Sequence, residues 1–145
     1  MMAKKRVFLD ECCSDLRSVF GAKAHVYTAK DLGVIGREDI YVINKAVASK
    51  CLIVTVNKDF VDYYREHPHR RGKAGSFFYG LIFLMPSRQL CRAQQLQKAL
   101  KDMEWRDTRM HDDLIFVTGD GRTKHHRLCH PECAAAFPKE QGEWG

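Results

Sequence analysis

The clearest pattern in this chain is an apolar run of strand length that ends abruptly in polar residues. Residues 51–60 read CLIVTVNKDF, so aliphatic residues give way to Asn57, Lys58 and Asp59. A short apolar run rich in Val and Ile is typical of a parallel strand buried on both faces. Ligands of open α/β sheets bind at the carboxyl ends of such strands. We therefore expect Asn57 and Asp59 at that edge of a sheet.

A second apolar run near the N-terminus ends in the same way. Residues 7–9 (VFL) follow three cations and break into Asp10 and Glu11. This run predicts the first strand, with Asp10 at its carboxyl end. Two strands that both end in acidic residues predict one acidic site.

The remaining pattern alternates strands with helices. Helical spacing predicts helices over 14–20, 38–47, 58–66 and 88–103, with Ile40, Ile43, Ala46 and Val47 on the buried face of the second. Further strands are expected at 25–28, 80–85, 113–118 and 122–128, a loop at 29–37, and a hairpin turn at 119–121 (GDG). The pattern predicts an α/β fold: a three-layer α/β/α sandwich with a mainly parallel central sheet and a C-terminal β-hairpin.

Length and composition favour one domain in a reducing compartment. We expect a domain over residues 1–128 and an appended C-terminal tail over 129–145. The apolar runs are too short to span a membrane and no signal-like segment opens the chain, so no membrane partner and a cytoplasmic location are predicted. Six cysteines in that setting do not predict a disulfide framework.

Positive charge gathers in two segments of this basic chain. Lys and Arg number 24 against 18 Asp and Glu, a formal net charge of +6, which favours polyanionic partners such as RNA. The first segment spans residues 65–73 and the second 122–127, and either is equally well explained as a solvated loop or edge strand. The candidate phosphate-binding residues are Arg65, Arg70, Arg71, Lys73, Arg122, Lys124 and Arg127.

A string of histidines and cysteines follows the second basic segment. Residues 125–133 read HHRLCHPEC, and such side chains are zinc ligands. His126, Cys129 and Cys133 are the candidates for a structural Zn²⁺. The C-x3-C spacing differs from the common C-x2-C knuckle, however, so an incidental Cys- and His-rich tail is the favoured interpretation.

These motifs, in this order, resemble a known family. Residues 8–11 (FLDE), the acid pair Glu38 and Asp39, residues 54–60 (VTVNKDF) and a basic last hairpin together resemble the small PIN-like domains with "LDE" and "VTxDxDF" signatures. Those domains are related to PIN-domain nucleases and to toxin components of toxin–antitoxin pairs. The resemblance covers about residues 7–128.

The resemblance implies a metal-dependent nuclease. The family's acidic positions match Asp10, Asp39 and Asp59, which would bind Mg²⁺ or Mn²⁺. Both are hard ions that prefer carboxylate and water oxygens. Asn57 stands where the family has the first acid of its "DxD" motif, so one charge is missing. It is expected to assist through its amide carbonyl, with Glu11 or Glu38 as candidates to replace the charge.

Two functions follow from these residues. The first is a metal-dependent ribonuclease, as a toxin with an antitoxin partner, in which Asp10, Asp39, Asp59 and Asn57 form the catalytic site. The second is a non-catalytic PIN-like module that binds RNA or protein, with Asn57 marking a degenerate site. A homodimer is also among the expected assemblies. Taken alone, Asp10 and Asp59 are each better explained as an ordinary strand-end or helix-cap residue, whereas together, in this register, they favour a metal site.

Overall fold

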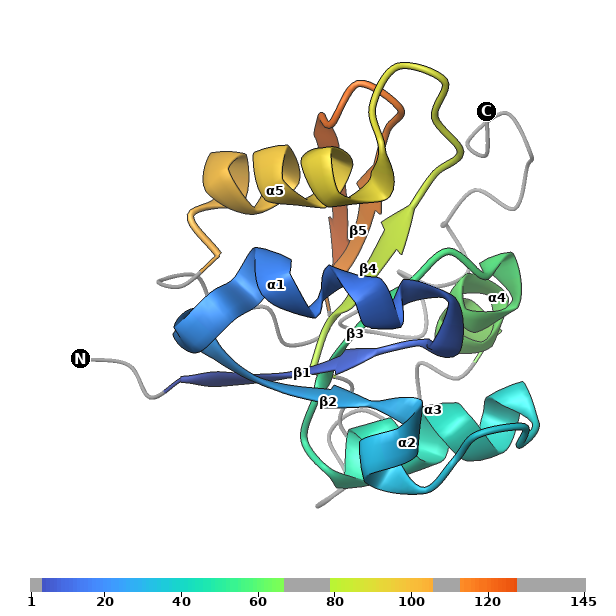
Figure 1. The fold of residues 1–145 in the computed structure, drawn as a ribbon. Coiled ribbons are helices and arrows are strands. Elements are labelled where there is room, and N and C mark those ends of the chain that lie inside the picture. The colour runs from blue at the N-terminus through green and yellow to red at the C-terminus, as the bar shows by residue number, and fades with distance from the viewer. Residues whose placement is uncertain (1–3, 67–78, 106–112, 128–145) are drawn as a thin grey trace.

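A six-stranded sheet forms the centre of the protein (Figure 1). The structure is a computed structural model that describes residues 4–66, 79–105 and 113–127. The strand order is β2-β1-β3-β4-β5-β6; the first five strands run parallel, and β6 pairs antiparallel with β5. The bounds are β1 Lys5–Leu9, β2 Ala24–Thr28, β3 Leu52–Thr55, β4 Leu81–Leu84, β5 Asp113–Val117 and β6 Thr123–Arg127.

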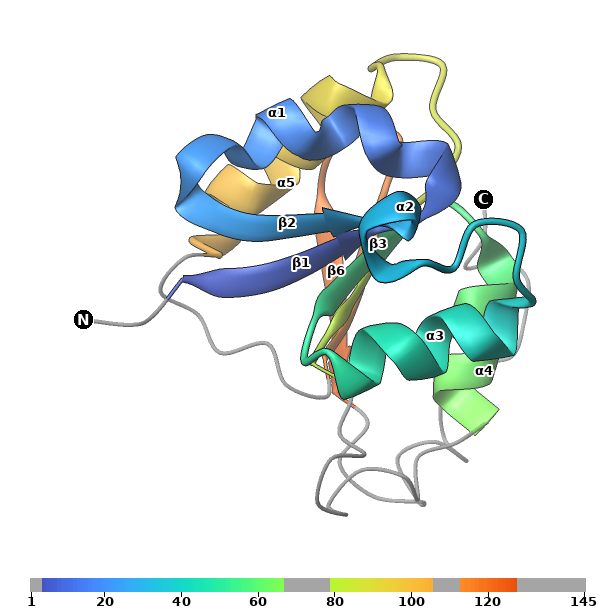
Figure 2. The same cartoon turned by 60° about the horizontal axis from the view of Figure 1, so that its bottom comes forward.

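Helices cover both faces of this sheet. One face carries η1 (Glu11–Leu16), α1 (Arg17–Phe20), η2 (Gly21–Lys23) and α5 (Arg92–Met103). The other carries α2 (Ala29–Leu32), α3 (Asp39–Ala48) and α4 (Lys58–Glu66). Figure 2 shows α1 and α5 on one side of the sheet and α3 and α4 on the other. The predicted α/β class, mainly parallel sheet and C-terminal hairpin are confirmed.

Alternating side chains of the strands build a separate core on each face. In β1, Phe8 packs with the α3 and α4 side, whereas Val7 and Leu9 pack with the α1 and α5 side. All four residues of β3 are buried, as predicted for a strand covered on both faces. Burial of these apolar side chains supplies most of the driving force that holds the helices against the sheet.

Three expectations about local structure are wrong. Residues 29–32 form α2 rather than a loop, because Thr28 and Asp31 make a capping box that fixes its first turn. The last helix begins at Arg92 rather than residue 88, because the Ser87 hydroxyl accepts hydrogen bonds from the backbone of residues 89 and 90 and closes a turn there. Ile40 is 53% exposed, and Val42 occupies the buried face of α3 instead.

The order of the strands creates a topological switch point at one edge of the sheet. From β1 the chain adds β2 on one side and then crosses over to place β3 on the other. Helical connections therefore diverge between the carboxyl ends of β1 and β3. Open α/β sheets place their ligands at such a switch point. The two apolar runs that end in polar residues are the two strands that flank it. Within the described ranges, no helix is long and apolar enough to cross a membrane.

One buried amide ties α5 to the edge of the sheet. Gln95 is 1% exposed, and its Nε2 lies 2.8 Å from the Met85 carbonyl, 3.1 Å from that of Val117 and 2.9 Å from that of Thr118. These carbonyls belong to the ends of β4 and β5. A buried carbonyl that loses its donor carries the full cost of desolvation.

We predict that Gln95→Leu lowers the free energy of unfolding by about 1–3 kcal/mol, because it removes the donor and leaves carbonyls buried. The matched control is Gln97→Leu, an exposed position on the same helix, which should change it by about 0.5 kcal/mol or less. Urea unfolding monitored by circular dichroism measures both. Equal effects of the two substitutions would contradict this role of Gln95.

Candidate functional site

Polar residues from three segments meet at the switch point between the carboxyl ends of β1 and β3. Asp10 directly follows β1, Thr55 ends β3, Asn57 follows it, and Asp39 begins α3. The backbone N–H of Asp10 donates to the Val54 carbonyl at 3.1 Å, which extends the β1–β3 pairing past the end of β1. The sequence therefore brings together residues that lie up to 47 positions apart in the chain.

Asp10 is a half-buried carboxylate. Its Oδ1 accepts the backbone N–H of Glu11 at 2.8 Å, and its Oδ2 accepts the Thr55 hydroxyl at 2.9 Å. Burial raises the pKa of Asp10 above its ordinary value of 3.8; the two hydrogen bonds oppose this, and the charges of Asp39 and Glu11 add to it. The site therefore holds a carboxylate whose charged form is disfavoured.

Thr55 connects Asp10 to the segment that follows β3. Its side chain is fully buried, and its hydroxyl, while donating to Asp10, accepts the backbone N–H of Asn57 at 2.9 Å. The hydroxyl thus has both a donor and an acceptor partner. This arrangement fixes the turn that carries Asn57 relative to the carboxylate of Asp10.

Asn57 uses its two side-chain atoms in different ways. Its Nδ2 donates to Asp39 Oδ2 at 3.1 Å, and its Oδ1 accepts the backbone N–H of Asp59 at 2.9 Å. The second bond caps the first turn of α4, and because a backbone N–H only donates, it requires the oxygen on that side. Asn57 therefore presents its amide N–H, rather than its carbonyl oxygen, to Asp39.

Glu11 holds the loop that leads into α3. Its Oε1 accepts the backbone N–H of Gly36 at 2.9 Å. This bond joins the end of β1 to the segment just before Asp39. One carboxylate oxygen of Glu11 is thereby occupied, although its charge still acts on Asp10.

The predicted acids are not all placed alike. Asp10 and Asp39 are linked through the hydrogen bonds of Thr55 and Asn57. Asp59 joins this network through its backbone N–H; its exposed side chain, in the first turn of α4, makes no hydrogen bond to it in the described part of the chain. Glu38 is the N-cap residue of α3, where its side chain makes no capping bond.

The described residues offer no cation to this acidic pair. No Lys or Arg in ranges 4–66, 79–105 and 113–127 forms an ion pair with Asp10 or Asp39. In those ranges no group of three or more His, Cys, Asp and Glu side chains is placed to hold a metal ion. Among the described residues, the donors that offset the repulsion between the two carboxylates are the Thr55 hydroxyl, the Asn57 amide and the backbone N–H of Glu11.

Of the seven basic candidates, four lie in the described ranges, and the side chains of two of these are described. Arg122, whose side chain is 81% exposed, pairs with Asp120 at 3.2 Å, and Lys124 is exposed on β6. The backbones of Arg65 and Arg127 belong to α4 and β6. Arg70, Arg71 and Lys73 fall outside the described ranges.

The zinc candidates cannot be assembled from the described residues. His126 packs edge-on against Phe116, with ring centroids 5.4 Å apart. As the next residue in the same strand, His125 lies on the opposite face. Cys129 and Cys133 lie outside the described ranges.

Sequence reasoning missed Thr55 as a part of the site. Its signal is a hydroxyl in an otherwise aliphatic buried strand, since a buried hydroxyl requires hydrogen-bond partners. The exposed pair Arg37 and Tyr41, with the guanidinium carbon 3.7 Å from the ring centroid, was missed as well. It lies beside Asp39 in sequence, at the start of α3.

Comparison of the chain with protein-family models, with curated proteins and with solved structures found no match.

We predict that Asp10→Asn stabilises the protein at neutral pH. Because the folded pKa of Asp10 is raised, ionisation of Asp10 lowers the stability of the wild-type protein as pH rises from about 3.8 through that folded pKa, and the variant lacks this contribution. The gain should be absent at pH 3 and fully developed at pH 7. Urea unfolding across this range, in EDTA, measures it. Asp15→Asn, an exposed acid of η1, is the control. A pH-independent difference between wild type and Asp10→Asn would contradict the assignment.

Proposed function

We propose that this protein is a metal-dependent ribonuclease of the PIN-like type, with Asp10 and Asp39 as the residues that hold Mg²⁺ or Mn²⁺. The observation that supports it most is the convergence of two carboxylates at the switch point without a cation partner among the described residues. A divalent ion would relieve both their repulsion and the unfavourable burial of the Asp10 charge.

The donor set fits a hard ion that keeps much of its water. Mg²⁺ is commonly held by one or two carboxylates, with water and substrate phosphate oxygens in the remaining positions. Asp10 and Asp39 supply such carboxylates, and Asp59 is our candidate for a further one because its exposed side chain begins α4. Asn57 contributes a hydrogen bond that orients Asp39 rather than an oxygen ligand.

The residues of this chain would supply negative charge to hold the ion and would hold the two carboxylates in position. A bound ion of this kind activates water and neutralises charge that develops on a phosphodiester. Thr55 holds Asp10 in one orientation, and Asn57 does the same for Asp39, so both carboxylates are preorganised. Glu11 keeps the loop before α3 in place beside them.

Single-stranded RNA is the substrate that we favour. Tyr41 is 42% exposed and carries Arg37 over its ring, next to Asp39 in the sequence. Aromatic rings and guanidinium groups stack on unpaired bases, and the positive charge of the chain favours phosphates. The basic clusters remain candidates for phosphate contacts, and an antitoxin, a homodimer and a cytoplasmic location remain predictions.

The second candidate is a non-catalytic PIN-like module that binds RNA or protein. The orientation of Asn57 favours it, because the position matched to a family acid presents an N–H to Asp39 and offers no oxygen there. A cation competes with that N–H for Asp39. The two candidates differ in whether an ion supports cleavage, which the next two experiments measure.

We predict that the purified protein cleaves single-stranded RNA with Mg²⁺ or Mn²⁺ and that EDTA stops cleavage. Asp10→Asn and Asp39→Asn should each lower the rate by at least about a hundredfold, because each removes a ligand charge. Asp15→Asn is the matched control and should cleave as wild type does. Metal-independent cleavage, or an Asp10→Asn variant as fast as the parent, would refute the proposal.

Asn57→Asp distinguishes the two candidate functions. It keeps the oxygen that caps α4 and replaces the N–H facing Asp39 by a second oxygen, so Mn²⁺ affinity should rise by about tenfold. In a nuclease, cleavage then requires less Mn²⁺. In a non-catalytic module, the variant binds Mn²⁺ and stays inert.

Calorimetric titration with Mn²⁺ beside an RNA cleavage assay separates these results. Asn44→Asp is the control, because Asn44 lies on α3 and accepts from the Tyr63 hydroxyl, and it takes no part in the hydrogen bonds that link Asp10 and Asp39. If Asn57→Asp leaves the Mn²⁺ affinity unaltered, Asn57 is not part of the metal site.

A further inference from the structure

A groove runs between α1 and α5, on the face of the sheet opposite α3 and α4. Its volume is about 700 Å³. It is distinct from the acidic site: Lys23 in its wall directly precedes β2, at the amino edge of the parallel strands, whereas Asp10 follows the carboxyl end of β1. None of the groove residues takes part in the hydrogen bonds that link Asp10 and Asp39.

The floor of the groove is apolar and well packed. Val19, Leu100 and Trp105 line it. Trp105 is only 6% exposed, because its ring meets Phe20 edge-on at a centroid distance of 5.2 Å. The indole ring is thus buried in the core, and it does not expose a flat face on which a nucleic-acid base could stack. Aliphatic side chains of a partner fit such a floor better than bases do.

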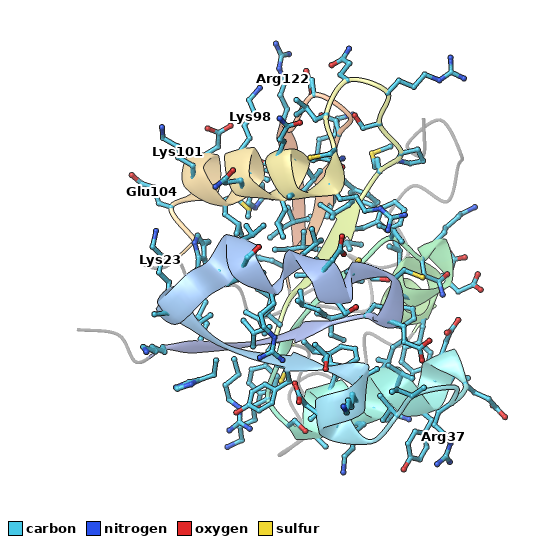
Figure 3. The ribbon with its side chains drawn as sticks, in the orientation of Figure 1. Lys23, Arg37, Lys98, Lys101, Glu104 and Arg122 are labelled. Atoms are coloured by element: carbon cyan, nitrogen blue, oxygen red, sulfur yellow. The ribbon has the colours of Figure 1, made fainter. Side chains whose placement is uncertain are left out.

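Lysines dominate the rim. Lys23 stands on the α1 side, and Lys98 and Lys101 stand on α5, with Glu104 as the acid (Figure 3). Three lysines against one glutamate leave a net charge of +2. The ammonium groups of Lys23 and Lys101 have no hydrogen bond or ion pair with any described residue. The rim therefore favours an acidic partner.

One rim lysine is held in place by the last hairpin. The Nζ of Lys98 donates to the Asp120 carbonyl at 2.8 Å. Its stem crosses Gly121, where a Cβ would lie 2.7 Å from Lys98 Cδ. The absence of a side chain at Gly121, whose φ is +87°, allows this crossing. Part of the positive rim is thus preorganised.

We propose that this groove binds an acidic, amphipathic helical segment of another protein. The 12 residues of α5 rise by about 18 Å, which matches roughly three turns of a partner helix. Leucine-like side chains at helical spacing would enter the floor, and carboxylates beside them would meet Lys23 and Lys101. This interaction requires no catalysis, so its test is independent of the nuclease proposal.

The test uses synthetic 14-residue peptides and the full chain. One has Leu at helical i, i+3, i+7 and i+10 positions and Glu at most others; a second replaces every Glu with Lys, and a third replaces every Leu with Ser. Fluorescence anisotropy of the labelled peptides should show binding of the first, no binding of the second, and at least about tenfold weaker binding of the third.

Charge reversal locates the site. The double variant Lys23→Glu, Lys101→Glu should weaken binding of the first peptide by about tenfold or more. Lys45→Glu is the matched control, because Lys45 is the last-turn lysine of α3 as Lys101 is that of α5. It should leave binding unchanged. The indole N–H signal of Trp105, identified in Trp144→Phe, should shift on addition of the first peptide.

Three outcomes would overturn the proposal. The first is peptide binding that survives in the double variant. The second is equal binding of the acidic peptide and its Leu→Ser form, which would indicate charge attraction without a groove. The third is an oligouridylate that displaces the peptide and loses its own affinity in the double variant, which would identify a nucleic-acid surface. RNA cleavage should be the same in the double variant as in the parent.

Discussion

The hydrogen bonds of Thr55 and Asn57 are the constraint on which the acidic site depends. Without them, the charges of Asp10 and Asp39, which repel each other, would lose the two side-chain donors that hold these carboxylates in place. The same two residues also fix the turn after β3 and begin α4. The short segment 55–59 therefore both shapes the chain after β3 and orients the two carboxylates.

The fold could largely be predicted because the sheet is read directly from apolar runs. Strands buried on both faces leave continuous aliphatic segments, and β3 and β4 were found in this way. The short α2 was not predicted, because four residues are too few to show a helical periodicity. Its capping box is the feature that specifies it. Apolar runs do not state the order of strands in a sheet, so the switch point between β1 and β3 could be located only in the structure.

The candidate site was predicted in its acids but not in its connections. Strand ends placed Asp10 and Asn57 at one edge, whereas no pattern in the sequence states which atom of Asn57 faces Asp39. That atom matters, because an N–H orients an acid and an oxygen ligates a metal. The groove between α1 and α5 was equally hidden, since its lysines come from segments about 75 residues apart and meet only through packing.

The cation site that we propose joins Asp10 and Asp39, and burial disfavours the charged form of the Asp10 carboxyl. Carboxyl-carbon NMR titration of Asp10, in EDTA and then in excess Mg²⁺, tests it most directly. The pKa of Asp10 should lie above 3.8 in EDTA, because the side chain is buried, and should fall when Mg²⁺ is added. A pKa at its ordinary value in EDTA, unchanged by Mg²⁺, would contradict the account.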